Sequence, residues 1–454
     1  MKSHIRVAAA SVGLVAMLSS CNSFLDAPKA IADPNAPVDA SVNQLFVGIQ
    51  ANIFGEQEGP VAMLICEWMQ QCAGTAGRFV ETQGTYSVTN SSFDGSFASI
   101  YNAGGLIQIR EAESRAEAAG DKRYKGVLEA LEIMNMLYGV DNWGSIPYRE
   151  ATISTTPHFD PQLQIYDDLL KLADQAISDL NGPGAGPGAF QGRSFDLIYG
   201  GDKTKWIQAV HTLKARIYLH LVETRGASQY TAALAEAQQG ISSPANDWTT
   251  AHSEGTSERN MWYQFQLTSF GQDLVAGARL VQIMKAQNDP RLPEYFGKNS
   301  TGNYGGYDVA TQQNVGEPSP IANAGRNTAT FSQPILTYDE NQLIIAEASL
   351  QTGNTVAAAA ALNNVRARHG KPPIAVPTLD DIMTEKYITL FQNIEYWNDY
   401  KRTCRPTLAP ALGRSVVPGR LPYGITELQT NPNAPSDPGP TLVTGRNPND
   451  PNPC

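Results

Sequence analysis

The chain has 454 residues and a formal net charge of −11. An acidic chain of this kind argues against nucleic acid as a partner and against a polybasic membrane-binding surface. After the first twenty residues, no stretch approaches the ~18 consecutive apolar residues that a membrane-spanning helix needs. The sequence therefore predicts a water-facing body whose contact with a membrane, if any, lies at its N-terminus.

The N-terminus has the pattern of a secretory signal peptide. A short basic region precedes an uncharged apolar segment, residues 7–18, which is too short to span ~30 Å of hydrocarbon. The letters LSSC, ending at Cys21, match a bacterial lipobox, in which the cysteine receives a diacylglycerol. We predict a lipoprotein signal peptide over 1–20, lipid attachment at Cys21 and a tether over 21–40. The alternative is an ordinary signal peptide with a cysteine near its cleavage site by chance.

Removal of Cys21 from the count leaves an even number of cysteines, in a compartment where disulfides persist. Cys404 follows a helical pattern and Cys454 ends a tail rich in Pro and Asn, so a disulfide between them would hold the tail on the body. Cys66 and Cys72 are harder to pair, because six residues of helix separate them by ~9 Å. They bridge only if the helix breaks between them, and otherwise they are small buried thiols.

Amphipathic helices are the main elements that the sequence predicts. Apolar residues recur at spacings of three and four over 166–180 and 206–221, and Asp202 can cap the second of these helices. Strand-like alternation is scarce. Further helical patterns occupy 41–54, 59–72, 97–118, 123–139, 272–287, 338–351, 355–368 and 379–400. Long loops are expected over 73–92, 141–160, 242–270 and 288–337.

The segment 338–369 predicts a helix hairpin. Its first helix ends near Gly353, Asn354 or Thr355 caps the second, and the second, rich in alanine, ends at Gly370. Small residues on the second helix let its partner approach closely, as in tetratricopeptide hairpins. We expect an all-α fold of such hairpins, a single domain over 41–454, with loop insertions on one side.

Motifs that carry catalysis or bind a cofactor are missing. The sequence contains no H-E-x-x-H, no G-x-S-x-G and no phosphate-binding G-x-x-x-x-G-K-[ST], so we expect no metal and no cofactor. His211 and His220 lie nine residues apart on one predicted helix and face opposite ways, which disfavours a shared metal site. We interpret these histidines as neutral structural or surface residues.

One pair of carboxylates suggests a sugar site. Glu395 and Asp399 lie one helical turn apart around Trp397, and such a pair beside an indole could hold a sugar ring. Lys401 and Arg402 follow directly, however, and this pattern favours an ion-paired helix end.

Several motifs, in one order, resemble those of a known family. They are "CNSFLDAPKAIADPNAP" from Cys21, "WGSIPYREA" from Trp143, "GGDKTKWIQAVHTLKAR" from Gly200, and "EKYITLFQNIEYWNDYKRT" from Glu385. In these motifs the chain resembles the SusD/RagB family of outer-membrane nutrient-binding lipoproteins over nearly its whole length. One departure is Phe97, where many members have a tryptophan, and we expect its ring to preserve the packing.

The resemblance implies a function. Such proteins are not enzymes; they form a lid on a SusC-like TonB-dependent β-barrel transporter at the cell surface and capture oligosaccharides or, in some members, peptides. A helical carbohydrate-active enzyme, a glycosidase or lyase, is the alternative from another class.

The candidate ligand contacts are aromatic residues of the long loops with polar neighbours. Sugar rings offer apolar faces to such rings, and their hydroxyls need polar side chains nearby. The candidates are Arg78, Glu81, Tyr86, Trp262, Tyr263, Tyr304 and Tyr307.

Overall fold

The protein is described by a computed structural model that covers residues 40–184, 195–321, 325–436 and 445–454. Two units divide the chain, Met1–Gln44 and Leu45–Cys454, and the second is compact. The predicted signal peptide and tether, with Cys21, lie outside the described residues. Within those residues, no helix has the length and apolar character needed to cross a bilayer.

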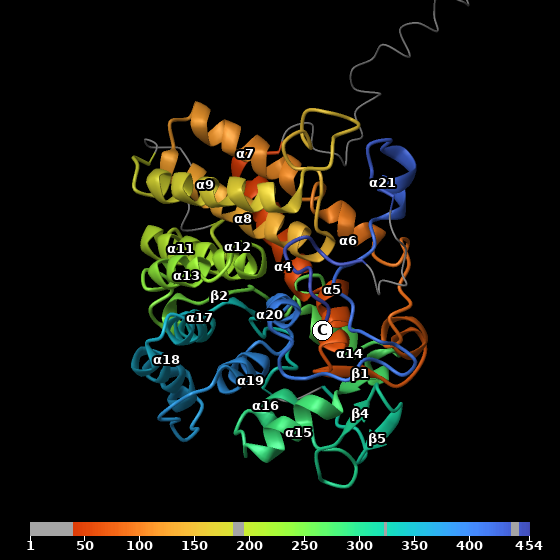
Figure 1. Cartoon of the computed structure of the whole chain (residues 1–454). Coiled ribbons are helices and arrows are strands. Elements are labelled where there is room, and N and C mark those ends of the chain that lie inside the picture. Colours follow the sequence, from red (N-terminus) through yellow and green to blue (C-terminus); the bar gives the residue numbers. More distant parts are fainter. Residues whose placement is uncertain (1–39, 185–194, 322–324, 437–444) are drawn as a thin grey trace, which may run out of the picture. The chain divides into compact units, whose positions relative to one another are not determined.

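Helices that follow one another in sequence also pack against one another. α7 (Leu106–Ala118) packs on α8 (Lys122–Trp143), and α8 packs on α9 (Gln162–Leu180). α11 (Lys203–His220) then lies between α9 and α13 (Ser228–Ala237). Figure 1 shows this succession at one side of the compact unit. The arrangement is the stack of helix hairpins that the sequence predicts.

The stack continues with the predicted hairpin. α17 (Tyr338–Gln351) packs on α13, and α18 (Thr355–Arg368) and α19 (Leu379–Thr389) pack on α17. Asn354 caps α18 by accepting from the backbone N–H of Ala357, as predicted. The core of this part is apolar and fully buried, and it includes Leu343, Ala346, Leu362, Val365 and Ile382.

The remaining helices are shorter or lie outside the stack. The N-terminal cap of α11 is Asp202, as predicted, with its carboxylate accepting from the backbone N–H groups of Thr204 and Lys205. The other α-helices are α4 (Val42–Glu58), α5 (Pro60–Trp68), α6 (Asp94–Ser99), α12 (Val222–Arg225), α14 (Met261–Gln266), α15 (Ala278–Ala286), α16 (Leu292–Tyr295), α20 (Glu395–Thr403) and α21 (Ile425–Thr430). Single turns of π or 3-10 helix are η1 (Phe79–Gln83), η2 (Pro244–Asn246) and η3 (Gly271–Asp273).

Strands are few and short in the part of the chain that the structure describes. They form antiparallel pairs that join segments far apart in sequence, β1 with β3 and β2 with β6, and one local hairpin of β4 and β5. Their bounds are β1 (Cys72–Gly74), β2 (Trp248–Thr249), β3 (Leu274–Ala276), β4 (Gly306–Asp308), β5 (Gln313–Val315) and β6 (Pro334–Leu336).

Several predicted helix boundaries are wrong. The helix predicted over 379–400 is two helices, because Gln392 takes a left-handed φ of 63° and the Asn393 side chain bonds the backbone of Pro334 and Ile335. The helix predicted over 97–118 breaks before Leu106, where Gly104 has a φ of 109°.

Segments predicted as loops or left unassigned also contain helices. α13 was not predicted, although it belongs to the stack, because its short alanine-rich sequence carries only a narrow apolar stripe. α14, within the predicted loop 242–270, begins where Asn260 caps the backbone N–H of Tyr263. The predicted loop 288–337 contains α16 and three short strands.

Both cysteine pairs form disulfides. α5 ends at Trp68, Gln70 takes a φ of 54°, and the Cα atoms of Cys66 and Cys72 lie 5.1 Å apart in their disulfide. The helix therefore breaks between them, which is the condition that their spacing required. Cys404 and Cys454 are bonded with Cα atoms 5.2 Å apart.

Aromatic residues of the helical motifs serve packing. Trp143, Trp206 and Trp397 are fully buried. The Phe97 ring is buried and meets the rings of Trp143 and Tyr423 edge to face, so the aromatic packing expected there is present.

Candidate functional site

A short antiparallel sheet brings two distant loop regions together. β1 pairs with β3 so that Cys72 lies opposite Ala276, and the backbone N–H of Thr75 donates to the carbonyl of Asp273 at 2.8 Å. The loop after α5 therefore lies beside the middle insertion, although about 200 residues separate them in sequence. Figure 1 shows β1, β4, β5 and α14 gathered on the side of the unit away from α17 and α18.

Rings from the two regions contact one another. The Phe79 ring of η1 meets the Phe265 ring of α14 edge to face, with centroids 5.4 Å apart. The Arg78 guanidinium lies 4.9 Å from the centroid of the Phe79 ring, a cation–π distance. Tyr307 of β4 lines a crevice together with Phe79 and Gln312. The two regions thus meet in one surface segment, where the Phe79 ring is buried in the contact and the Arg78 side chain is exposed at its edge.

Apolar side chains are also exposed next to this surface. Leu267 and Phe270 follow α14, and each is 60% exposed. The Phe270 ring therefore presents an apolar face to solvent among the described residues. We call this set the loop surface: Arg78, Glu81, Tyr263, Leu267, Phe270, Tyr304 and Tyr307.

The base of the loop surface is held in place by polar contacts. Arg414 donates from Nε to the carbonyl of Thr85 at 2.7 Å and from Nη2 to Ser87 Oγ at 2.6 Å. Lys285 donates to the carbonyl of Tyr304 at 3.3 Å. A loop fixed in this way loses less conformational entropy when it binds a ligand.

The residues predicted as ligand contacts separate into two groups. Arg78 and Glu81 are exposed, and Tyr263, Tyr304 and Tyr307 are half-buried. Tyr86 and Trp262, in contrast, are 5% and 4% exposed.

The two buried members are packing residues. The Tyr86 hydroxyl accepts from the backbone N–H of Ala411 at 3.2 Å, and its ring meets that of Trp68 edge to face. Trp262 lies on the buried face of α14. Sequence reasoning missed Leu267 and Phe270, because exposure within a loop follows from tertiary packing and has no local signal.

A cleft lies between α4 and the middle insertion. Its volume is about 620 Å³, and its lining includes Val47, Phe54 and Met261 on the apolar side and Arg259 and Gln264 on the polar side. Volumes of ~300–1,000 Å³ are typical of small-ligand sites. We call it the insertion cleft, and it shares α14 with the loop surface.

A buried ion pair holds the insertion against α4. His252 Nε2 lies 2.7 Å from Glu58 Oε1, and Glu58 Oε2 accepts from the backbone N–H of Met261 at 3.0 Å. Burial by itself lowers the pKa of His252, but Glu58 outweighs it, and the pKa is raised. The charged pair therefore sets the position of the wall of the insertion cleft.

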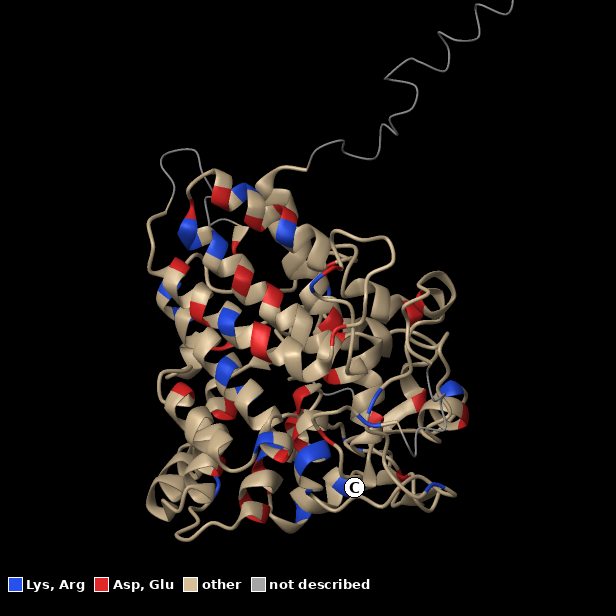
Figure 2. Ribbon diagram, turned by 45° about the horizontal axis from the view of Figure 1, so that its top comes forward, with Lys and Arg blue, Asp and Glu red and all other residues tan. Residues whose placement is uncertain are grey.

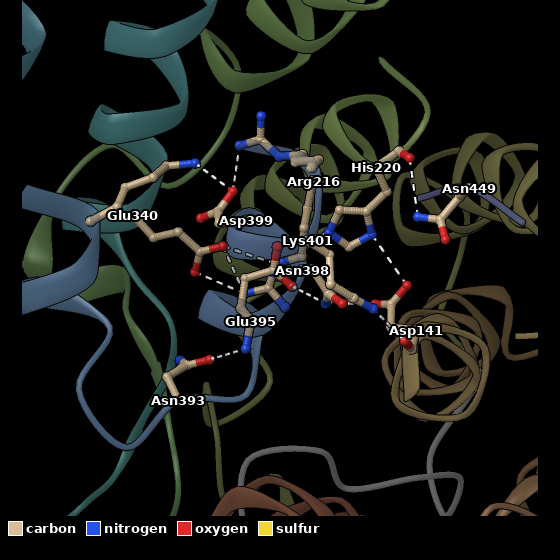
Figure 3. Close-up of polar contacts among 12 residues, drawn as sticks. Asp141, Arg216, His220, Glu340, Asn393, Glu395, Asn398, Asp399, Lys401 and Asn449 are labelled. Carbon is tan, nitrogen blue, oxygen red and sulfur yellow. Dashed lines mark hydrogen bonds and ion pairs between the residues drawn. The ribbon is translucent and has the colours of Figure 1, made fainter. Parts of the chain in front are cut away.

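One group of potential metal ligands lies together among the described residues: Asp141, His220 and Glu395 (Figure 3). All three side chains are buried. His220 Nε2 lies 2.8 Å from Glu395 Oε1, and Nδ1 lies 3.2 Å from Asp141 Oδ1, an ion-pair distance. Burial by itself lowers the pKa of His220, but Asp141 and Glu395 raise it to about 10.

This charge state decides the chemistry of the group. A doubly protonated imidazole has no lone pair for a metal ion. Arg216 adds a second cation 3.4 Å from Glu395, and Lys401 donates to the carbonyl of Asp141 at 2.8 Å. The group is an ion-paired core that joins α8, α11 and α20, and the prediction of a neutral His220 is wrong.

The carboxylates around Trp397 belong to the same kind of structure. Glu395 pairs with His220 and Arg216, and Asp399 pairs with Lys386 at 3.0 Å and with Arg402. Both carboxylates are buried, so they are not available to a sugar ring. The prediction of ion pairing is confirmed, but most of the partners come from other helices.

Charges of both signs are interspersed along the helices rather than gathered by sign (Figure 2). Paired charges of both signs connect the helices of the scaffold, among them Arg216 with Glu395 and Lys386 with Asp399.

Comparison with known proteins agrees with this description. Residues 34–367 match the family described as "Starch-binding associating with outer membrane". The chain is similar to a SusD homologue from Bacteroides thetaiotaomicron, with a TM-score of 0.71 and 18% identity over 91% of this chain and 100% of that one. A SusD homologue from Bacteroides uniformis gives a TM-score of 0.71 and 17% identity over 87% and 94% of the two chains.

A chitin-binding SusD homologue from Flavobacterium johnsoniae gives a TM-score of 0.66 and 19% identity over 85% of this chain and 93% of that one. At such identities, the solved structures show a shared fold. Comparison with curated proteins gives no match.

The stack of helix hairpins with an exposed loop surface places this protein in the class of helical ligand-binding proteins. The family match extends over most of the chain and places it further: the chain belongs to the SusD/RagB family of outer-membrane nutrient-binding proteins, which are binding proteins and not enzymes.

Proposed function

We propose that this protein captures oligosaccharides on its loop surface and delivers them to a SusC-like TonB-dependent transporter in the outer membrane. The observation that carries the proposal is the exposed apolar group at the junction of two loop regions: Phe270, 60% exposed, follows α14, and Phe265 of α14 contacts the Phe79 ring of the other region. Sugar rings pack their C–H faces on such rings. Arg78 and Glu81 at its edge supply hydrogen bonds to hydroxyl groups.

The first experiment asks which class of oligosaccharide the protein binds. One solved neighbour is a chitin-binding protein, so chito-oligosaccharides belong in the panel beside malto-oligosaccharides and short peptides. We expect calorimetric binding of at least one glycan to the full chain in detergent. Replacement of Phe270 and Tyr307 by alanine should abolish it, while the matched exposed variant Ile153→Ala, 82% exposed on another loop, should not. Binding of peptides and of no glycan would contradict the oligosaccharide proposal and would favour a peptide-binding function.

Delivery to a transporter predicts a stable partner. A SusC-like β-barrel should co-purify with the full chain from outer membranes solubilised in mild detergent. A chain that purifies alone under these conditions, with its glycan binding intact, would count against the transporter while leaving the binding proposal standing.

The proposed membrane anchor is the lipid on Cys21. Cys21→Ser removes the acceptor thiol, so the protein should leave the membrane fraction while its folded structure, measured by circular dichroism, stays the same. Retention of the Cys21→Ser variant in membranes after a high-salt wash would contradict the lipid anchor.

A further inference from the structure

A second cleft lies on the other side of α4 from the insertion cleft. Its volume is about 490 Å³, and α4, α6 and the buried Tyr138 of α8 line it. Ala51 and Gly55 line both clefts, so this part of α4 forms the ridge between them. The volume again lies in the range of ~300–1,000 Å³ that is typical of small-ligand sites. We call it the Glu56 cleft.

The walls of the Glu56 cleft lack side chains at positions where side chains would fit. A Cβ atom added to Gly48, Gly55 or Gly95 would meet no heavy atom within 4 Å. Gly48 lies in the interior of α4, where a glycine costs ~1 kcal/mol relative to alanine, and Gly55 lies in the last turn of the same helix. Packing does not require these glycines. Their effect is to keep the cleft open.

Glu56 is a buried acid with an unpartnered atom. Its side chain lines the cleft and is 3% exposed. Oε1 accepts from Asn52 Nδ2 at 3.1 Å and from Ser99 Oγ at 3.2 Å, whereas Oε2 has no hydrogen-bond partner among the described residues. A buried polar atom without a partner costs ~1–3 kcal/mol and calls for an explanation.

The surroundings of Glu56 favour its neutral form. Burial raises the pKa of Glu56 well above its ordinary value, and the hydrogen bonds from Ser99 and Asn52 only partly oppose this. No Lys or Arg is among the described residues that line the cleft. The protonated acid carries an O–H donor, and the described residues give it no acceptor.

The other polar groups of the cleft are also uncharged. The Tyr138 hydroxyl lies within hydrogen-bonding reach of Ser96 and Ser99, and Asn52 and Ser99 line the cleft as well. The set combines hydroxyl donors and acceptors with an amide and a carboxylic acid. An anion would find no cation here, whereas a neutral ligand with several hydroxyl groups would find both donors and acceptors.

We propose that the Glu56 cleft is a binding site for a neutral, hydroxyl-rich ligand of one or two sugar units, separate from the loop surface. Asn52, Ser96 and Ser99 are partly exposed in the cleft and form the hydrogen bonds to the ligand hydroxyls. Neutral Glu56, whose unpartnered Oε2 is closed to solvent, orients Asn52 and Ser99 by accepting from them at Oε1. The glycines of α4 and α6 leave the space that the ring occupies.

The test fills the cleft without touching its polar groups. Gly95→Leu places a side chain in the open space of the Glu56 cleft and does not line the insertion cleft. Ala118→Leu, at an exposed position at the end of α7, is the matched control for an added surface leucine. Glucose, N-acetylglucosamine and maltose are the probes, read by saturation-transfer NMR on the full chain in detergent.

We expect binding of at least one probe that Gly95→Leu weakens by ~10-fold or more and Ala118→Leu leaves unchanged. Glu56→Leu should have the same effect as Gly95→Leu, because it removes the acceptor that orients Asn52 and Ser99. Glu56→Gln, which is neutral and keeps an acceptor oxygen, should weaken binding by only ~3-fold. Circular dichroism and thermal unfolding identify a variant that fails to fold. If a Glu56 variant fails to fold, Gly95→Leu decides the test, because it leaves the buried residues unchanged.

Three outcomes would overturn the proposal. The first is that no probe shows binding that Gly95→Leu weakens. The second is that the Phe270→Ala and Tyr307→Ala pair removes all probe binding, which assigns it to the loop surface. The third is preference for a primary amine such as butylamine over the sugars, which would make Glu56 a charged acceptor. Binding of longer glycans to the loop surface is measured separately, so failure of this proposal is distinguishable from failure of the proposed function.

Discussion

The buried ion-paired group of Asp141, His220, Arg216 and Glu395, which we call the ionic core, and the loop surface contain similar types of residue. Their side chains are buried and paired in the first and exposed or half-buried in the second. In the core, Glu395 is bonded to His220 and Arg216, all three are buried, and Trp397 beside them is covered completely. On the loop surface, Arg78 lies over an aromatic ring and Phe270 is mostly exposed. An acid beside a tryptophan therefore does not indicate a sugar site by itself. What distinguishes the two regions is whether neighbouring helices already satisfy the groups.

Removal of one charge from the ionic core should give the largest effect. Glu395→Gln leaves Arg216 and His220 without their carboxylate, and breaking a buried pair in this way costs ~3–5 kcal/mol. Urea unfolding measures the change. The control is Asp167→Asn in the exposed pair with Arg225, where we expect less than ~1 kcal/mol. Equal losses in the two variants would remove the distinction between core and surface charges.

The two disulfides should differ in their contributions. The Cys404–Cys454 disulfide closes a loop with a sequence separation of 50, and Cys66–Cys72 one with a separation of 6. In the chain-entropy model these loops correspond to ~4 and ~2 kcal/mol. Each value is the difference in unfolding free energy between oxidised and reduced protein, with the other pair replaced by alanine. A larger contribution from Cys66–Cys72 would show that local packing outweighs loop closure.

The ionic core should also make stability depend on pH. The pKa of His220 is raised from 6.5 to about 10 by Asp141 and Glu395 against the effect of burial. A raised folded-state pKa gives stability that is complete below pH ~6.5 and is lost as the pH rises through 10. Unfolding free energies should therefore decline from pH 7 to pH 10.

A variant of His220 tests whether this residue causes the pH effect. Besides its two carboxylates, Arg216, Lys401 and Asp450 lie in the same network. His220→Gln removes the titrating group, so the decline above pH 7 should become shallower. An unchanged slope in the His220 variant would assign the pH dependence to other residues.

The smallest expected effect on stability lies on the loop surface. Phe270→Ala should change the unfolding free energy by no more than ~0.5 kcal/mol, because the ring is mostly exposed. Glycan affinity, in contrast, should fall by ~1–2 kcal/mol through lost apolar contact. Calorimetric binding and urea unfolding of the same preparation separate the two quantities. A stability loss comparable to that of Glu395→Gln would place Phe270 in the scaffold.

Local sequence signals predicted much of the scaffold. Apolar periodicity located most helices of the stack, and Asp202 and Asn354 marked two helix starts correctly because capping depends on residues within one turn. The break between Cys66 and Cys72 was left open. It depends on the left-handed turn at Gln70 and on the pairing of β1 with a strand 200 residues away.

The candidate site was predicted only in part. The loop regions were identified, but Tyr86 and Trp262 proved buried, and Leu267 and Phe270 were missed. Residue type indicates what a side chain can bind, whereas its exposure depends on which distant segments cover it. Glu56, in the last turn of α4, carried no local sign of an unusual environment.

The sequence by itself determined the helical class, most helices of the stack and the family motifs, because these depend on short-range periodicity and on contiguous patterns. Tertiary structure decided which charges became partners, which aromatic rings stayed exposed and where the clefts opened. The physical reason is that burial and pairing result from contacts between segments far apart in sequence. Those contacts raise the pKa of His220 and leave Glu56 Oε2 without a hydrogen-bond partner among the described residues.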